Sequence, residues 1–176
     1  MMRTLNIIVL SFFIGSLAAL AQEPATSFKD KLYTGGQIGL SFGNYTNIII
    51  SPMLGARLNE KVYAGIGAEY QYTKDKRWEP SLTYNQYGGR LFAQYNIIPQ
   101  LFAHLEFQGM SMEKYKLGGG KERNFVPFLY VGGGYRQYIS QRSFISFRVL
   151  FDVLQDKNSP YKAWDPNFSI GVGVGI

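Results

Sequence analysis

The sequence predicts an all-β protein in which eight antiparallel strands close into an up-and-down barrel. Eight segments of about ten residues alternate apolar and other side chains with a period of two, which is typical of a strand whose two faces meet different surroundings. The links between these segments alternate between short and long. The composition, with 13 Tyr, 13 Phe and 20 Gly against 17% charged residues, favours strands and turns over helices.

The first residues of the chain do not belong to this barrel. Residues 1–21 combine a short positively charged start, the apolar run LNIIVLSFFIGSL and the A-x-A pattern Ala19-Leu20-Ala21, which together predict a cleavable signal peptide. Residues 22–31 then form a short periplasmic N-terminal tail, and residues 32–176 form the barrel domain. The chain has no cysteine, which excludes a disulfide framework, a thiolate metal site and a cysteine nucleophile.

The first four predicted strands carry their apolar residues at alternate positions. These positions are Leu32, Thr34, Gly36, Ile38, Leu40 and Phe42 in 32–42; Ile48, Ile50, Pro52, Leu54, Ala56 and Leu58 in 47–58; Val62, Ala64, Ile66, Ala68, Tyr70 and Tyr72 in 62–72; and Tyr87, Gly89, Leu91, Ala93, Tyr95 and Ile97 in 87–97. Pro52 cannot donate a hydrogen bond to a neighbouring strand, so it indicates a bulge in the second strand.

The last four predicted strands follow the same rule. Their apolar positions are Leu101, Ala103, Leu105 and Phe107 in 101–110; Phe125, Pro127, Leu129, Val131 and Tyr135 in 125–139; Ile145, Phe147, Val149, Phe151 and Val153 in 143–154; and Phe168, Ile170, Val172, Val174 and Ile176 in 167–176. In the final strand, Ser169 and three glycines occupy the other face.

The links predict which end of the barrel is which. Links 59–61, 98–100 and 140–142 are short, whereas the links after the third, fifth and seventh strands are long and polar. Only 43–46 is short among the links at the second end. An even number of antiparallel strands with tight turns at one end and long loops at the other is the layout of an outer-membrane barrel.

Alternation alone does not say which face is outside, because a water-soluble barrel of the lipocalin kind has the same period. Three observations favour a transmembrane barrel with its apolar face outward. Every ionisable strand residue lies on the opposite face: Arg57, Glu69, Arg90, His104, Glu106, Arg136, Arg148 and Asp152. No lysine lies in any predicted strand, although a sheet surface in water normally carries several. The polar face mixes small and bulky residues, which suits a narrow lumen filled by its own side chains.

With eight strands, asymmetric links and a closing C-terminal strand, the chain resembles the small outer-membrane barrels of the OmpX and OmpA-transmembrane type, described as outer membrane β-barrel domain or porin-family proteins. The likeness covers residues 32–176. It implies a bacterial outer-membrane location and contact with the barrel-assembly machinery through a C-terminal signal. That signal would consist of Phe168, Ile170, Val172, Val174 and Ile176, with Ile176 standing where such signals usually close on Phe or Trp.

The inward charges predict an ion-pair network in the lumen. We expect it to centre on Glu106, flanked by Arg90 and Arg136, because an unpaired charge in that confined space would be costly. Such a network fills and stiffens the barrel. The alternative is a gated pore, in which the protein would be a narrow porin-like channel, although a narrow eight-stranded lumen is normally too full to conduct.

A second alternative is a lipid A modifying enzyme, because the chain resembles the lipid A deacylases in size. Those enzymes use a His-x-Ser pair on the outer face. Here His104 is followed at that spacing by Glu106, and His104 is predicted to point inward, so no serine nucleophile is suggested. We expect no enzymatic activity, no cofactor and no metal site.

The long loops 74–84, 113–123 and 156–165 mix basic and aromatic residues. The residues expected to make surface contacts are Lys76, Arg77, Trp78, Lys116, Lys121, Arg123, Lys162 and Trp164. Such side chains suit contact with lipopolysaccharide headgroups or an extracellular ligand, although they are equally compatible with solvated loops. The net charge of +6 is scattered, which argues against nucleic acid. The sequence therefore predicts a monomeric integral outer-membrane protein with a structural or surface-interaction role.

Overall fold

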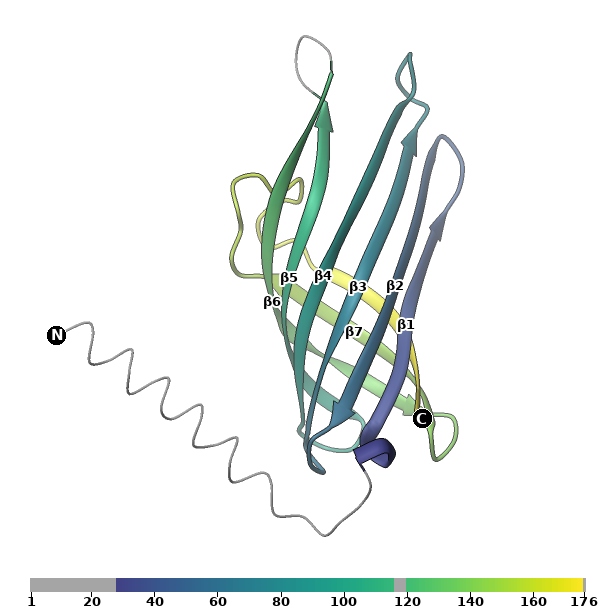
Figure 1. Ribbon diagram of the computed structural model, residues 1–176, viewed down its shortest axis with the longest axis vertical. Coiled ribbons are helices and arrows are strands. Elements are labelled where there is room, and N and C mark those ends of the chain that lie inside the picture. Colours follow the sequence, from purple (N-terminus) through teal and green to yellow (C-terminus); the bar gives the residue numbers. More distant parts are fainter. Residues whose placement is uncertain (1–27, 116–119, 176) are drawn as a thin grey trace, which may run out of the picture.

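The computed structural model describes residues 28–115 and 120–175. A short 3₁₀ helix, η1 (Phe28–Lys31), leads into eight strands. These are β1 (Leu32–Ser41), β2 (Tyr45–Arg57), β3 (Val62–Asp75), β4 (Leu82–Asn96), β5 (Leu101–Tyr115), β6 (Lys121–Tyr138), β7 (Ser143–Asp152) and β8 (Asn167–Gly175). The strands pair in chain order, each antiparallel to the next, and β8 returns to β1 to close the barrel (Figure 1). The predicted fold class is confirmed, whereas the predicted signal peptide lies outside the described residues.

The strands at the loop end are longer than the sequence predicts. The β3–β4 hairpin stays paired up to Asp75–Leu82, and the β5–β6 hairpin up to Tyr115–Lys121. These two hairpins rise above the ends of β7 and β8 (Figure 1). The expectation that no lysine lies in a strand is therefore wrong: Lys74, Lys114 and Lys121 lie in these extensions. Above the apolar band the outward face no longer needs apolar residues, so pairing continues there without apolar alternation, while inward Thr73 and Asp75 of β3 stay buried.

The tight links at the other end are held by side-chain oxygens. Asn59 Oδ1 accepts hydrogen bonds from the backbone N–H groups of Lys61 and Val62, at 2.9 and 2.7 Å. Ser140 Oγ does the same for Arg142 and Ser143, at 3.3 and 3.0 Å. Asn and Ser favour such turns because their short side chains reach the backbone two or three residues further on.

The apolar face is outside. Ile66, Leu91 and Ile170 are 56%, 59% and 62% exposed, whereas the ionisable residues Glu106 and Arg148 on the opposite face are 3% and 4% exposed. A barrel in water would bury the first set and expose the second. Because a closed sheet also pairs its backbone within the wall, this is the arrangement of a transmembrane barrel.

The lumen is packed by setting large side chains of one strand over glycines of the next. A Cβ atom at Gly173 would lie 2.2 Å from the Phe144 ring, and one at Gly55 would lie 2.3 Å from the Tyr33 ring. This explains the glycines that alternate along β8, because any larger inward residue at position 173 would displace Phe144.

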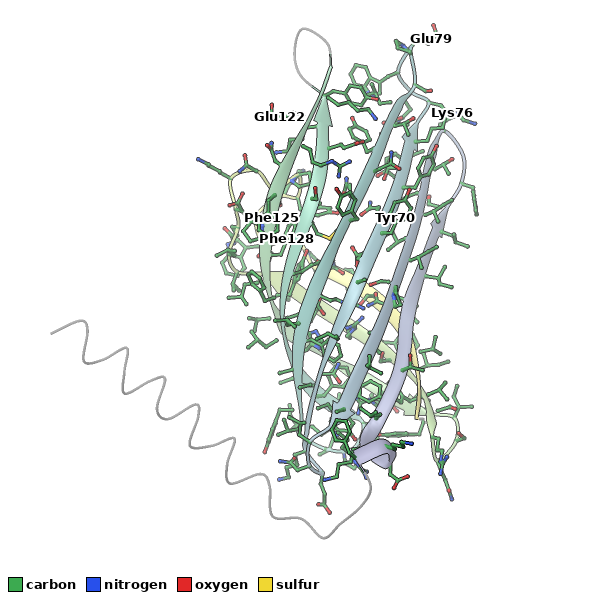
Figure 2. The ribbon with its side chains drawn as sticks, viewed as in Figure 1. Tyr70, Lys76, Glu79, Glu122, Phe125 and Phe128 are labelled. Atoms are coloured by element: carbon green, nitrogen blue, oxygen red, sulfur yellow. The ribbon has the colours of Figure 1, made fainter. Side chains whose placement is uncertain are left out.

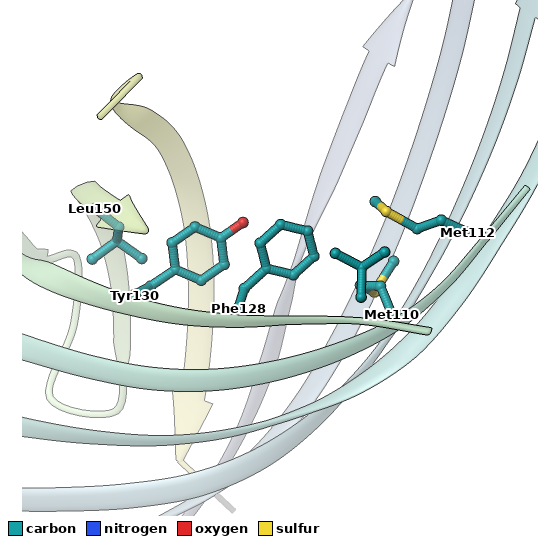
Figure 3. Packing of buried hydrophobic residues seen from close by; sticks show 6 residues of the cluster. Met110, Met112, Phe128, Tyr130 and Leu150 are labelled. Carbon is teal, nitrogen blue, oxygen red and sulfur yellow. The ribbon is translucent and has the colours of Figure 1, made fainter. Parts of the chain in front are cut away.

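Two apolar clusters fill the lumen at different heights. The cluster nearer the turns contains Tyr33, Met53, Phe92 and Phe144, with Tyr63 packed against it. The cluster nearer the loops contains Met110, Met112, Val126, Phe128, Tyr130 and Leu150 along β5, β6 and β7 (Figure 3). Along β7, Arg148 lies between Phe144 of the first cluster and Leu150 of the second.

Pro52 does not produce the predicted bulge. The β2–β3 register has the same offset at Ile50–Tyr70 as at Met53–Gly67, so the ladder is interrupted at residues 51 and 52 without inserting a residue. Pro52 points outward, and its missing N–H removes a ladder hydrogen bond and leaves the alternation intact.

Candidate functional site

A cluster of buried charges lies at mid-height in the lumen and is centred on Glu106 of β5. Arg90 of β4 and Arg148 of β7 approach its carboxylate with Nη1 atoms at 3.7 and 3.9 Å. His104 Nε2 lies 3.0 Å from Glu106 Oε2. The period-two pattern brings these side chains to one face, and closure of the sheet brings β4, β5 and β7 to the same space.

His104 is held on both ring nitrogens. Its Nδ1 lies 3.1 Å from Gln94 Nε2, which can only donate, so Nδ1 accepts and the ring proton is on Nε2, directed at Glu106. The imidazole also stacks on Phe92, with ring centroids 5.8 Å apart. Within the described residues no serine hydroxyl hydrogen-bonds to this histidine, whose two ring nitrogens face Gln94 and Glu106.

The expected pairing of Arg136 with Glu106 is wrong. Arg136 Nη2 instead donates to Gln94 Oε1 at 2.6 Å. Its guanidinium lies over the rings of Tyr63, Phe102 and Phe144, 4.7 to 5.0 Å from their centroids. Arg136 is only 1% exposed, so this stack fills the lumen near the turns. Arg148 is the second arginine beside Glu106, the position that the sequence predicts for Arg136. Arg148 on β7 lies at the same height in the barrel as Glu106 on β5.

Three other predicted members of the network lie outside the Glu106 cluster. Glu69 accepts a hydrogen bond from Ser51 Oγ at 3.2 Å. Arg57 is exposed at the turn end of β2. Asp152 terminates β7 by accepting from the backbone N–H groups of Leu129, Leu154 and Gln155, at 3.1, 3.0 and 3.2 Å. Asp152 therefore shapes the start of the β7–β8 loop.

A cavity of about 290 Å³ adjoins the charge cluster on its loop side. Its polar lining includes Gln37, Glu69, Gln71, Gln108, Asn167 and Ser169, together with the charged residues Arg90, Glu106 and Arg148. Tyr161, from the loop between β7 and β8, lies against Phe128 with ring centroids 6.0 Å apart and lines the same cavity. Gln37 and Tyr161 were missed by the sequence reasoning: Gln37 is an inward polar residue of β1, but nothing in the sequence marks Tyr161.

In the described part of the chain, some of the predicted surface residues are held by ion pairs to acidic residues, and others are not. Lys121 and Arg123 lie in β6, and both bind Glu113 of β5, at 3.2 and 2.6 Å. Arg77 forms a two-pronged pair with Asp75, at 2.8 and 2.6 Å. Hydrogen bonding to Arg77 holds the pKa of Asp75 below its ordinary value.

Side chains also join the two raised hairpins above the point where the β4–β5 ladder ends, at Tyr87–Ser111. Tyr115 Oη accepts from the Thr83 N–H at 3.1 Å, and Lys121 Nζ donates to the Thr83 carbonyl at 2.7 Å. Glu113 accepts from the Asn85 N–H at 2.9 Å, and this bond, helped by Lys121, keeps the pKa of Glu113 below its ordinary value. The hairpins therefore form one braced unit.

The remaining surface residues make no such ion pair or hairpin contact with the part of the chain that the structure describes. Lys76 lies with Glu79 at the upper end of the barrel (Figure 2), and Trp78 and Trp164 are more than half exposed. Lys162 is exposed in the β7–β8 loop. Lys116 lies outside the described residues.

The predicted assembly signal lies on the lipid-facing side of β8. Phe168, Ile170, Val172 and Val174 all point outward and are about half to three-quarters exposed. Ile176 lies outside the described residues.

The described ranges contain neither a candidate metal site nor a membrane-spanning helix. No group of three or more His, Cys, Asp or Glu residues there is arranged to hold a metal ion. Among the described residues no helix is long and apolar enough to span a bilayer.

Comparison with known proteins gives matches to solved structures alone. No protein-family model matches the chain, and no curated protein matches it. A structure from the de novo design of transmembrane β-barrels is similar over 88% of this chain and 98% of its own, with 12% identity and a TM-score of 0.42. The N-terminal β-barrel domain of Pseudomonas aeruginosa OprF is similar over 82% of this chain and 96% of its own, with 10% identity and a TM-score of 0.45. Neither likeness indicates a function for this chain.

Proposed function

We propose that the protein is an integral barrel of a bacterial outer membrane whose role is structural and surface-interacting, through the two raised hairpins, rather than catalytic. In this proposal the apolar band contacts outer-membrane lipid and lipopolysaccharide, and the barrel-assembly machinery reads β8 during insertion. An extracellular ligand would meet the hairpin tips.

The observation that carries the proposal is the braced unit formed by β3–β4 and β5–β6. Glu113, Tyr115 and Lys121 of the β5–β6 hairpin bind Asn85 and Thr83 of the β3–β4 hairpin, where the two backbones no longer pair. A flexible loop would lose conformational entropy on binding a partner, whereas a braced unit has lost most of it already. Free Lys76 and exposed Trp78 stand at the link of the first hairpin, where a partner can reach them.

The outer edge of β6 adds a second contact surface. Residues 123–128 pair with β5, but no strand in the described part of the chain pairs with their other edge, since the β6–β7 ladder ends at Tyr130–Asp152. An unpaired edge can accept a strand from another protein. The charged residues Lys121, Glu122 and Arg123 discourage indiscriminate pairing there.

The filled lumen supports this role over the channel alternative. Arg136 and the three rings around it occupy the lumen near the turns, and His104, which is 2% exposed, lies in the next layer. We therefore expect negligible conductance across planar bilayers. The enzyme alternative predicts a lipid A mass shift on expression, and we expect none, because both nitrogens of His104 are engaged.

Complementation tests the proposal. A strain lacking the protein is supplied with the native chain or with a shortened chain. In the shortened chain, one Asn-Gly dipeptide replaces the whole segment 76–81 and a second Asn-Gly dipeptide replaces the whole segment 116–120. Outer-membrane fractions of both should give the heat-modifiable gel mobility of a folded barrel. Attachment to surfaces and uptake of a hydrophobic dye are then measured. We expect the native chain to restore attachment and the shortened chain to fail. Full restoration by the shortened chain would show that the hairpin tips carry no function.

A further inference from the structure

The seam between β1 and β8 is only partly closed. Its ladder holds four pairs, from Tyr33–Gly175 to Gly36–Val172. Beyond Gly36, β1 continues to Ser41 paired with β2 alone, while residues 167–171 of β8 pair with β7 alone. The loop-end half of the wall therefore has a gap between residues 37–41 and residues 167–171.

The lumen opens sideways through this gap. The 290 Å³ cavity is lined by the inward residues Gln37 and Ser169 and also by the outward residues Ile38, Phe168 and Ile170. Outward residues cannot line the lumen of an intact wall. Ile38, Phe168 and Ile170 are apolar and well exposed, so the gap opens within the apolar band, toward lipid.

The inner end of the cavity holds the guanidinium groups of Arg90 and Arg148, whose hydrogen-bonding capacity is only partly used among the described residues. Arg90 Nη2 donates to the Ser51 carbonyl at 3.5 Å. The side chains of Arg90 and Arg148 are 3% and 4% exposed, and the Nε atom of each is buried without a hydrogen-bond partner. Their distances to Glu106, 3.7 and 3.9 Å, exceed hydrogen-bond length. Gln37, at the edge of the gap, can turn its amide oxygen toward both groups, reaching Arg90 Nη1 at 3.1 Å. Glu69 and Glu106 also line the cavity, and Glu106 pairs with both guanidinium groups. A further carboxylate can accept two parallel hydrogen bonds from the N–H groups that remain, which a neutral head group cannot match.

The cavity is closed toward the turns and only partly covered toward the loops. On the loop side Tyr161 packs against Phe128, but it is 53% exposed and also lines two further cavities. Toward the turns, Phe92, His104 and Arg136 fill the lumen. The approach through the gap is bordered by the apolar residues Ile38, Phe168 and Ile170, so a ligand that uses it must be partly apolar.

We propose that this cavity binds a single-chain amphiphile with a carboxylate head, namely a long-chain fatty acid, taken laterally from the membrane. The carboxylate lies on Arg90 and Arg148, and the chain leaves the barrel between Ile38 and Phe168. At about 290 Å³ the cavity is at the lower end of small-molecule sites, so it holds the head and the first part of one chain while the rest stays in the gap. The proposal requires the barrel to stand in a membrane but is independent of any surface partner.

Native mass spectrometry of the detergent-released protein tests the proposal with palmitate as the probe. We expect a one-to-one palmitate adduct, and an affinity for the uncharged hexadecanol at least tenfold weaker. Arg148→Gln should weaken palmitate binding at least tenfold. Arg57→Gln, the same change at an exposed arginine, should leave it unchanged. Absence of a palmitate adduct, or equal binding of palmitate and hexadecanol by the native chain, would overturn the proposal, even if Arg148→Gln does not fold.

A reversible disulfide across the gap tests lateral entry. The chain has no cysteine of its own, so two introduced cysteines can pair only with each other. Continuing the register of Gly36–Val172 sets residue 39 opposite residue 169. In the double variant Gly39→Cys/Ser169→Cys, a disulfide would draw the gap shut. We expect the oxidised form to lose palmitate binding at least tenfold and the reduced form to regain it. Equal binding by the disulfide-bonded and reduced forms would contradict lateral entry.

Discussion

Replacing Val149 by arginine tests the assignment of the outer face. Val149 lies near the middle of β7, points outward between Gly133 of β6 and Phe168 of β8, and is 38% exposed in the isolated barrel. An arginine on the lipid face near the bilayer midplane costs about 2–4 kcal/mol, and the cost falls to about 0–1 kcal/mol near the interfaces. The expected change in the folding equilibrium is therefore about 30- to 700-fold.

The matched control is Ile98→Arg. Ile98 is a similarly exposed apolar residue, but it lies in the tight link between β4 and β5, at the turn end of the barrel. Urea unfolding of both variants in phospholipid vesicles, followed by heat-modifiable gel mobility, gives the two free energies of unfolding. Equal losses for Val149→Arg and Ile98→Arg would refute the placement of β7 in the bilayer.

Three further predictions concern the lumen and the hairpins. Glu106→Gln leaves two buried arginines without their anion and should destabilise the barrel by about 3–5 kcal/mol in the same urea assay; a loss below 1 kcal/mol would contradict the network. Gly173→Val forces a methyl group against Phe144 and should cost about 1–3 kcal/mol, most of it recovered in combination with Phe144→Leu; additive losses would argue against that packing. The pKa of Glu113 is lowered in the folded hairpins, so its stabilising contribution is present above about pH 4.3 and is lost as the pH falls through the lowered pKa. The protection of the backbone amides of residues 82–86 against hydrogen exchange, corrected for the intrinsic exchange rate at each pH, should therefore fall in acid, and unchanged protection factors would exclude this role.

The strand count and the inward and outward faces could be predicted because both follow from one local rule. Side chains alternate along a strand, and lipid on one side permits only apolar residues there. Leu105 and Glu106 illustrate this: their neighbouring positions alone assign one to lipid and one to the lumen. The strand extensions could not be predicted in this way. Lys121, Glu122 and Arg123 show no apolar alternation because the sheet has already left the bilayer.

The partners within the lumen were predicted only in part. The sequence indicates that Glu106, Arg136 and Arg148 all point inward, but the height of each residue depends on strand tilt and on the register between strands. Those quantities place Arg148 beside Glu106 and Arg136 among aromatic rings. The gap between β1 and β8 is likewise a property of the register, since the sequences of both strands alternate without interruption through it.

A single-cysteine scan along β5 tests the central claim most directly. Each residue from Leu101 to Gln108 is replaced in turn by a spin-labelled cysteine in lipid vesicles, and its collision rates with oxygen and with a water-soluble nickel complex are compared. The account predicts high oxygen contact at Leu101, Ala103, Leu105 and Phe107, and low oxygen contact at Phe102, His104, Glu106 and Gln108. The reverse pattern, or no alternation at all, would contradict a barrel that faces lipid with its apolar side and encloses its charges.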